Sequence, residues 1–220
     1  PSVSRDSLNN LWVFFGTGRF LDTSDKTNSD QQTFYGIKDG CWSGLCTTTY
    51  ILANLLNTTA VQVSTSTGSA SQVSGSTAAC GGASTCSYTT LVQTLRESQG
   101  WYIYLSNPTT PSERVLSSAV ILGGVVLFTT FIPNSDICAM LGDSYVYALY
   151  YETGTAYNKP VIGDDGTYIY KSKSLGKGMP TTIGVGIGKE TKGFIQTSTG
   201  TIVEVDTEAP DVKSRPVGWR

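Results

Sequence analysis

Apolar and aromatic residues gather in short runs along the chain, and glycine, serine, threonine and asparagine separate one run from the next. Runs that are rich in β-branched and aromatic residues and bounded by turn formers are typical of β-strands. From residue 101 onward such runs follow one another almost without interruption. The sequence therefore predicts a mainly β protein, with strands at 10–21, 32–39, 60–65, 101–105, 114–121, 124–132, 144–151, 167–173, 180–188, 192–198 and 201–206.

The stretch 41–100 differs from the rest of the chain and is interpreted as an insertion into the β structure. Residues 66–86 are nearly all Ser, Thr, Gly and Ala, and because this composition offers no core we predict a loop, pinned at its end by cysteines. Apolar residues spaced for one helical face predict a short helix at 50–56 and another at 88–99. Gly100 is expected to cap the second helix.

The strands come in strand–turn–strand blocks that cannot bury their apolar faces alone and need neighbours stacked around an axis. A propeller blade takes about 40–50 residues, so the chain without its insertion has material for roughly three blades. A closed ring needs about four blades or more. We therefore expect residues 1–220 to form an arc of a β-propeller with several blades. This arc would be the C-terminal portion of a propeller domain that the missing N-terminal part of the same protein completes.

Composition and charge narrow the possible functions. Only 15% of the residues are charged and the net charge is −2, so the chain has no basic field to attract nucleic acid or anionic lipid. No apolar run reaches the roughly 18 residues that a membrane span needs. The chain has no histidine, which removes the commonest general base and transition-metal ligand. Abundant Gly, Ser, Thr, Tyr and Asn are typical of extracellular β proteins.

The five cysteines form two close pairs and one remainder. Cys41 with Cys46, and Cys80 with Cys86, are expected to be disulfides made in an oxidising compartment. A bridge from Cys41 or Cys46 to Cys138 stays open, and Cys138 is otherwise a candidate for a bridge to another chain. The alternatives are free thiols of a cytosolic protein and a metal site, although the spacing is not that of a zinc finger.

One polar loop carries the oxygen ligands that Ca²⁺ prefers. Asp22, Asp25, Asn28 and Asp30 fall within nine positions, and we treat them as a candidate calcium site. The spacing is not that of an EF-hand, and no glycine stands at the turn. The alternative is a solvated connection between two strands.

Other patterns favour structure over chemistry. Asp164 and Asp165 are adjacent, so in a strand their side chains would point to opposite faces and could not flank one glycosidic bond. With Gly166 they predict a turn instead. Asn57 begins an Asn-Thr-Thr glycan acceptor pattern, which a chain rich in Asn and Thr also produces by chance. Serine has no histidine to activate it, so we expect no catalytic and no cofactor-binding residue.

Four tryptophans, Trp12, Trp42, Trp101 and Trp219, are candidates for a sugar-binding platform. Tryptophan is highly buried on average, and we expect at least two of the four in the core. The platform therefore stays an alternative to plain core packing.

Several blocks occur in the same order as in the C-terminal region of the PilY-type tip adhesins of type IV pili, which this chain resembles. They are 1–3 (PSV), 13–21 (VFFGTGRFL), 32–39 (QTFYGIKD), 100–105 (GWYIYL), 113–116 (ERVL), 128–136 (FTTFIPNSD), 147–149 (YAL), 195–200 (IQTSTG) and 218–220 (GWR). The resemblance implies a C-terminal propeller and a role in pilus assembly, attachment and twitching motility. The calcium loop of that family lies upstream of the matched region, so the resemblance places it on no residue of this chain.

We therefore expect a non-enzymatic extracellular adhesin or assembly factor at the pilus tip, exported through the periplasm. Its expected partners are the missing N-terminal part of the same protein, minor pilins or the pilus fibre, and a host or abiotic surface. Two alternatives stay open. One is a fragment of a quinoprotein-like propeller dehydrogenase, and the other is a sugar-binding or structural surface propeller unrelated to pili.

Overall fold

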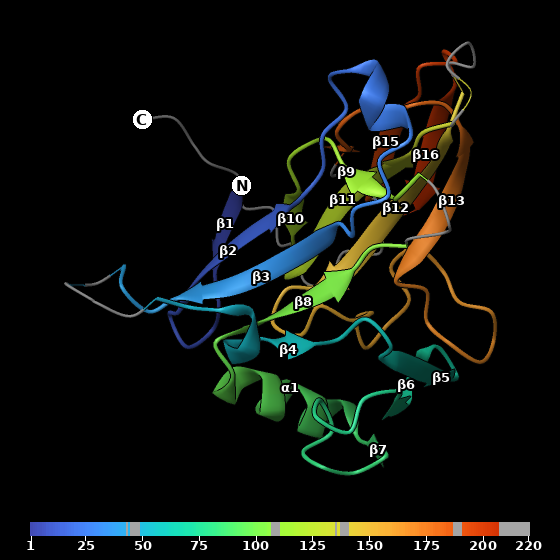
Figure 1. Ribbon diagram of the computed structural model, residues 1–220. Coiled ribbons are helices and arrows are strands. Elements are labelled where there is room, and N and C mark those ends of the chain that lie inside the picture. Colours follow the sequence, from blue (N-terminus) through green and yellow to red (C-terminus); the bar gives the residue numbers. More distant parts are fainter. Residues whose placement is uncertain are drawn as a thin grey trace, which may run out of the picture.

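The computed structural model describes residues 1–42, 44, 49–106, 111–134, 136, 141–186 and 191–206. The described part is mainly β, as predicted, and its strands form several sheets with few helices (Figure 1). No helix within it has the length and hydropathy to span a membrane. The observed elements differ from the predicted ones in several places, for reasons that lie in tertiary packing.

The first sheet contains five strands in the order β1-β2-β3-β8-β4. Its members are β1 (Ser2–Arg5), β2 (Leu11–Gly16), β3 (Thr33–Asp39), β8 (Gly100–Tyr104) and β4 (Leu56–Asn57). The first four are antiparallel and β4 runs parallel to β8. β1 was not predicted, and it pairs with β2 from Ser2 opposite Phe14 to Arg5 opposite Leu11. The strand predicted at 10–21 ends at Gly16, before the polar loop.

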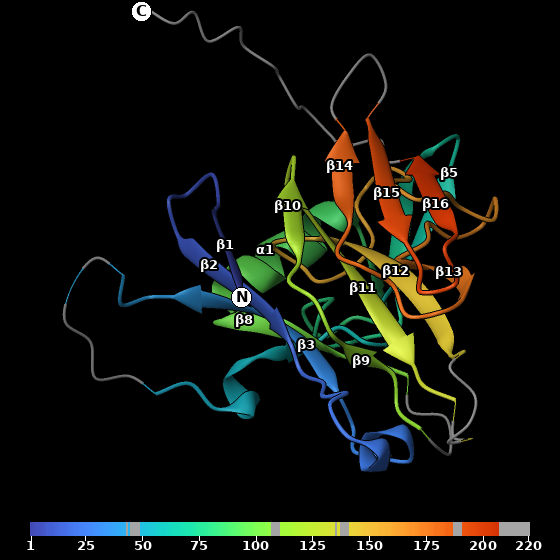
Figure 2. The ribbon, with the colours of Figure 1, turned by 90° about the horizontal axis from the view of Figure 1, so that it is seen from above.

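The second and third sheets follow along the chain as antiparallel meanders. The second has the order β10 (Val120–Leu122), β11 (Val125–Ile132), β12 (Asp143–Tyr150) and β13 (Ser172–Lys177), and β9 (Arg114–Val115) also pairs with β11. The third consists of β14 (Gly184–Gly186), β15 (Lys192–Gln196) and β16 (Ile202–Asp206). Figure 2 shows the three sheets side by side in chain order.

The second sheet is buried on both faces. Val126 and Phe128 of β11 belong to the core shared with the first sheet, where the ring of Phe128 stacks on that of Phe34 at 3.8 Å between centroids. Val125 and Leu127 belong to a separate core shared with the third sheet. Successive side chains of a strand point to opposite faces, so the continuous apolar run of β11 is what a strand covered on both sides requires.

The insertion contains more regular structure than its composition predicts. Residues 66–86 are not a plain loop, because β5 (Gln62–Ser66), β6 (Ser69–Ser74) and β7 (Thr85–Cys86) form a three-stranded sheet. Val73, Ala79 and Cys80 are buried in the main core, which corrects the expectation that this stretch builds none. The alternation of apolar and polar residues that marks a strand cannot be recognised here, because Ser and Ala occupy most positions on both faces of the hairpin.

Of the two predicted helices, one is confirmed. Helix α1 (Tyr88–Glu97) begins after Ser87, whose hydroxyl accepts a hydrogen bond from the amide of Thr90, and it buries Leu91 and Leu95. The helix predicted at 50–56 is wrong, since only the 3₁₀ turn η2 (Leu52–Asn54) forms there. Its aliphatic residues Ile51 and Leu52 are exposed, so no core contact favours a longer helix.

Gly100 does not cap α1 but opens β8. It has a φ of +142°, and a Cβ there would lie 2.3 Å from the carbonyl oxygen of Gly36. The helix end is instead held by Lys38 of β3, whose ammonium donates to the carbonyls of Leu95, Arg96 and Ser98. A strand of the first sheet therefore fixes the insertion in place.

Three other predicted strands differ from those observed. The strand at 114–121 is divided into β9 and β10. Of the strand predicted at 180–188, the structure describes residues 180–186, and within them β14 forms. The strand at 167–173 begins five residues later, as β13, after isolated bridges between Tyr168 and Ser64 and between Ile169 and Asp164. At these positions residues form isolated bridges or leave the regular pairing of the sheet.

Candidate binding cleft

The candidate calcium loop is folded around a buried carboxylate. Asp25 of the 3₁₀ helix η1 (Thr23–Lys26) pairs with the guanidinium of Arg19 at 2.8 Å and accepts hydrogen bonds from the amides of Leu21 and Asp22. The backbone hydrogen bond from Leu21 is the main cause that lowers the pKa of Asp25 to about 2. Both of its oxygens thus have protein partners in this conformation.

The other three candidate ligands also serve the loop itself. Asp22 caps η1 by accepting from the amide of Ser24, and the side chains of Asn28 and Asp30 are hydrogen bonded to each other at 2.8 Å. No group of three or more His, Cys, Asp or Glu side chains in the described ranges is placed to hold a metal ion. The calcium site stays a prediction from the sequence.

A buried arginine explains why this loop is ordered. The guanidinium of Arg114 donates to the carbonyl oxygens of Arg19, Asp25 and Asn28 at 2.7–3.2 Å. Arg114 lies in β9, at the edge of the second sheet, so one side chain joins the loop of the first sheet to its neighbour. The loop that suggested a metal site is therefore held to the second sheet by hydrogen bonds from Arg114 to its main-chain carbonyls.

One of the two predicted disulfides is confirmed. Cys80 and Cys86 form a disulfide. Cys41 is also disulfide-bonded. Cys46 and Cys138 lie outside the described residues, so the bridges predicted for them are not tested.

The three tryptophans that the structure describes do not form a common platform. Trp12 and Trp101 are fully buried, as expected for at least two of the four, whereas Trp42 is 38% exposed and lies under the guanidinium of Arg5. Trp219 is outside the described residues. The turn predicted at Asp164 and Asp165 is present, since each carboxylate accepts an amide hydrogen bond from residues just after it.

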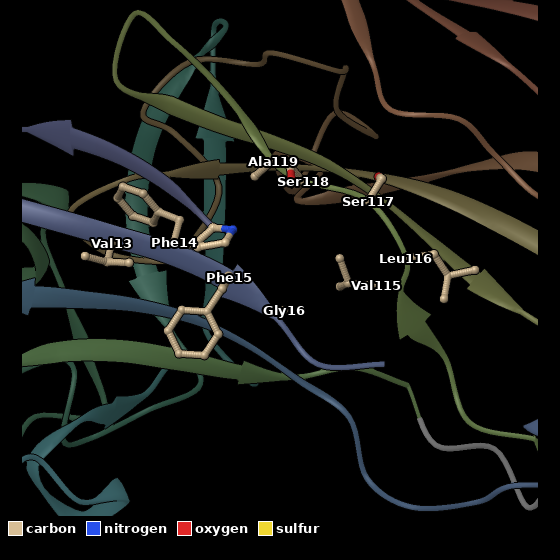
Figure 3. Close-up of a pocket in the computed structure, with 10 residues that line it drawn as sticks. Val13, Phe14, Phe15, Gly16, Val115, Leu116, Ser117, Ser118 and Ala119 are labelled. Atoms are coloured by element: carbon tan, nitrogen blue, oxygen red, sulfur yellow. The ribbon is translucent and has the colours of Figure 1, made fainter. Parts of the chain in front are cut away.

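A cleft of about 600 Å³ lies between the end of β2 and the segment that connects β9 to β10 (Figure 3). Two hydrogen bonds join its walls. The hydroxyl of Ser2 donates to the carbonyl of Ala119 at 2.6 Å, and the amide of Val115 donates to the carbonyl of Thr17 at 3.1 Å. The lining residues are Pro1, Val13, Phe14, Phe15, Gly16, Val115, Leu116, Ser117, Ser118 and Ala119.

The cleft exists because the strand that faces β11 is interrupted. Val115 lies opposite Thr130 and Val120 lies opposite Leu127, so the four residues 116–119 stand opposite only two residues of β11. The extra residues leave the ladder and form one wall of the cleft, in the manner of a bulge. Gly16 allows β2 to lie close to Val115. A Cβ at position 16 would be only 2.4 Å from Cγ2 of Val115, so a larger residue would collide with it.

The lining of the cleft is apolar, with two serines among its residues. Apart from Gly16, the residues that line it carry aliphatic, aromatic or serine side chains, and none is Asp, Glu, Lys, Arg, Cys or Tyr. Its size is within the range of about 300–1,000 Å³ that ligand sites commonly have. Sequence reasoning identified 13–21 as a motif but missed 116–119, although the two serines that break the apolar run at 115–122 were a visible signal.

Comparison with known proteins gives one relative. The chain is 30% identical over 151 residues to a protein of Xylella fastidiosa described as "Type IV pilus biogenesis factor PilY1 homolog". The match takes in 67% of this chain but 11% of the relative, so the chain spans about a tenth of that protein's length. No family model and no solved structure matches. The match supports the expected relation to PilY-like type IV pilus biogenesis factors.

Proposed function

We propose that this chain is a non-enzymatic, extracellular part of a PilY-like protein that acts at the pilus tip in assembly, attachment and twitching motility. The similarity to a PilY1 homolog over two thirds of the chain carries the proposal. The side chains of the residues that line the cleft are uncharged, which favours binding over catalysis. The Cys80–Cys86 disulfide is compatible with export to an oxidising compartment.

We also propose that the three sheets are consecutive blades of a β-propeller. β1-β2-β3-β8, β10-β11-β12-β13 and β14-β15-β16 are successive antiparallel meanders, and the insertion lies between the third and fourth strands of the first. The first strands of two neighbouring sheets, β1 and β10, lie next to each other. A sheet that packs a neighbour on each face, as the second does, is what the middle blade of an arc needs.

Deletion of the gene tests the proposed role. We expect fewer surface pili by electron microscopy and a smaller twitching zone, both restored by a plasmid copy of the whole gene. Comparing attachment of the remaining piliated cells separates an adhesin from an assembly factor, because an adhesin is needed even when pili are present. A deletion strain with normal pili, normal twitching and normal attachment would show the proposal to be wrong.

A further inference from the structure

We propose that a second cleft, between β5 and residues 165–172, binds one acidic sugar unit, a hexuronic acid. Such a site goes beyond the proposed function and does not depend on it. The cleft has a volume of about 230 Å³, below the range of about 300–1,000 Å³ that is usual for drug-sized ligands, and it therefore suits a group as small as one sugar ring. Its polar lining residues are Gln62, Asp165, Tyr168, Tyr170, Lys171 and Ser172.

Main-chain hydrogen bonds hold the two walls of this cleft together. The amide of Thr65 donates to the carbonyl of Thr167 at 2.8 Å, and the amide of Ile169 donates to the carbonyl of Val63 at 2.9 Å. The cleft therefore has its shape before a ligand binds, as small-molecule sites usually do.

The ammonium group of Lys171 has few partners within the protein. It donates to the carbonyl oxygen of Thr59, and no other described group accepts from it. An ammonium carries three N–H donors, so two of them are open to water or to a ligand. Burial lowers the pKa of Lys171, and no carboxylate among the described residues offsets this effect. Because buried charges in proteins are normally paired, a ligand carboxylate beside Lys171 would supply the missing counter-charge.

The second charged residue of the lining, Asp165, favours a hydrogen-bond donor on the ligand. Its Oδ1 accepts from the amides of Thr167 and Tyr168 at 2.8 and 2.6 Å, whereas no described group donates to its Oδ2. A simple anion would offer Asp165 no donor and would face it with like charge, and a neutral sugar would offer Lys171 no counter-charge. A hexuronic acid carries a carboxylate and several hydroxyl groups on one ring, so it matches both residues.

The neutral part of the lining suits a sugar ring better than a shorter ligand. No hydrogen bond within the described chain uses the side-chain amide of Gln62 or the hydroxyl groups of Tyr168 and Tyr170. These groups both donate and accept, as the hydroxyl groups of a sugar do. An amino acid would match Lys171 and Asp165 but would leave these groups to water. The apolar lining residues, which can contact the C–H groups of a ring, are Val61, Val63, Ala156 and Ile169.

An NMR titration of the 220-residue chain at pH 7 tests the proposed site, with the amides of residues 168–172 as reporters. The probes are D-galacturonate and D-glucuronate, and the matched controls are galactose and glucose, which carry CH₂OH in place of the carboxylate. We expect at least one of the two acids to bind at least tenfold more tightly than its neutral counterpart, and also more tightly than acetate or glycine.

Variants locate the binding in this cleft. Lys171→Met keeps the aliphatic stem but removes the ammonium, and it should weaken binding of the acid at least tenfold. Lys173→Met, at an exposed position two residues away, should leave the affinity within twofold. Gln62→Ala, also at an exposed position, should weaken binding at least threefold.

Three results would overturn the inference. The first is equal binding of the acids and their neutral counterparts, or no saturable shift with either acid. The second is acetate or glycine binding as tightly as the better acid, which would leave a plain carboxylate site. The third is a folded Lys171→Met variant that binds like Lys173→Met or, where circular dichroism shows Lys171→Met to be unfolded, a Gln62→Ala variant that binds like wild type. Because the assay involves no pili, its failure would leave the proposed function standing.

Discussion

Lys38 offers the sharpest test of how the insertion is fixed to the first sheet. Its side chain is 9% exposed, and its ammonium donates to Ser98 at 2.7 Å and to the carbonyls of Leu95 and Arg96 at the end of α1. A cation at a helix C-terminus also interacts favourably with the helix dipole. Replacing Lys38 with Met keeps much of the aliphatic stem but removes the donor, so the variant isolates the polar part of the contact.

The magnitude follows from the number of bonds and from the cost of burying the charge. One hydrogen bond to a charged group is worth about 1.5–3 kcal/mol. Burial lowers the pKa of Lys38, because the ammonium loses hydration on folding, and this offsets part of the gain. For Lys38→Met we therefore expect the free energy of unfolding to fall by about 2 kcal/mol, measured from urea denaturation curves at pH 7.

A matched control separates this contact from a general effect of charge. Lys173 is an exposed lysine of β13, and Lys173→Met should change the free energy of unfolding by less than about 0.5 kcal/mol. Hydrogen exchange should become faster in α1 of the Lys38 variant and stay unchanged in β11. If Lys38→Met proved as stable as Lys173→Met, the insertion would be held by apolar packing alone, and a stabilising role for the Lys38 ammonium would be refuted.

Three further predictions use other buried groups. Burial raises the pKa of Glu113, so its contribution to stability is greatest below the unfolded pKa and is lost as pH rises through the folded pKa. The melting temperature of wild type relative to Glu113→Gln should therefore fall between pH 4 and pH 7, and a constant difference would contradict this. Joint replacement of Cys80 and Cys86 by Ala should lower the free energy of unfolding by about 2 kcal/mol, and equal urea midpoints without reductant would show that the bridge adds nothing. Leu127→Ala should cost about 2–5 kcal/mol, and a near-neutral variant would mean that the second sheet is not buried against the third.

The strands that the sequence predicts well are those with large side chains on a buried face. β3 and β8 carry the large buried side chains of Phe34 and Trp101, and the continuous apolar run of β11 has the composition of a strand covered on both sides. β1 was missed because Ser-Val-Ser-Arg has one apolar residue, Val3, which is 62% exposed. Main-chain pairing with β2 holds this strand in place, and the pattern of side chains in a sequence does not show such pairing.

The same limit applies to β6. Its turn from β5 passes through Thr67 and Gly68, both with positive φ, and such a tight turn is compatible with the Ser-Thr-Gly composition that also suggested a loop. The only large apolar side chain of the strand is Val73, which is fully buried. One residue is too few to reveal a period of two, so only the tertiary contact identifies the strand.

The cleft could not have been predicted from any one strand, because its walls belong to two different sheets. Phe34 and Phe128 bring the first two sheets together at their centre, with ring planes 1° apart. At the edge the walls come from β2 and from 116–119, and the bond from Ser2 to Ala119 joins residues 117 positions apart. A cleft at the edge of stacked sheets thus depends on register between distant segments, whereas the pattern within a strand indicates only which of its faces are buried.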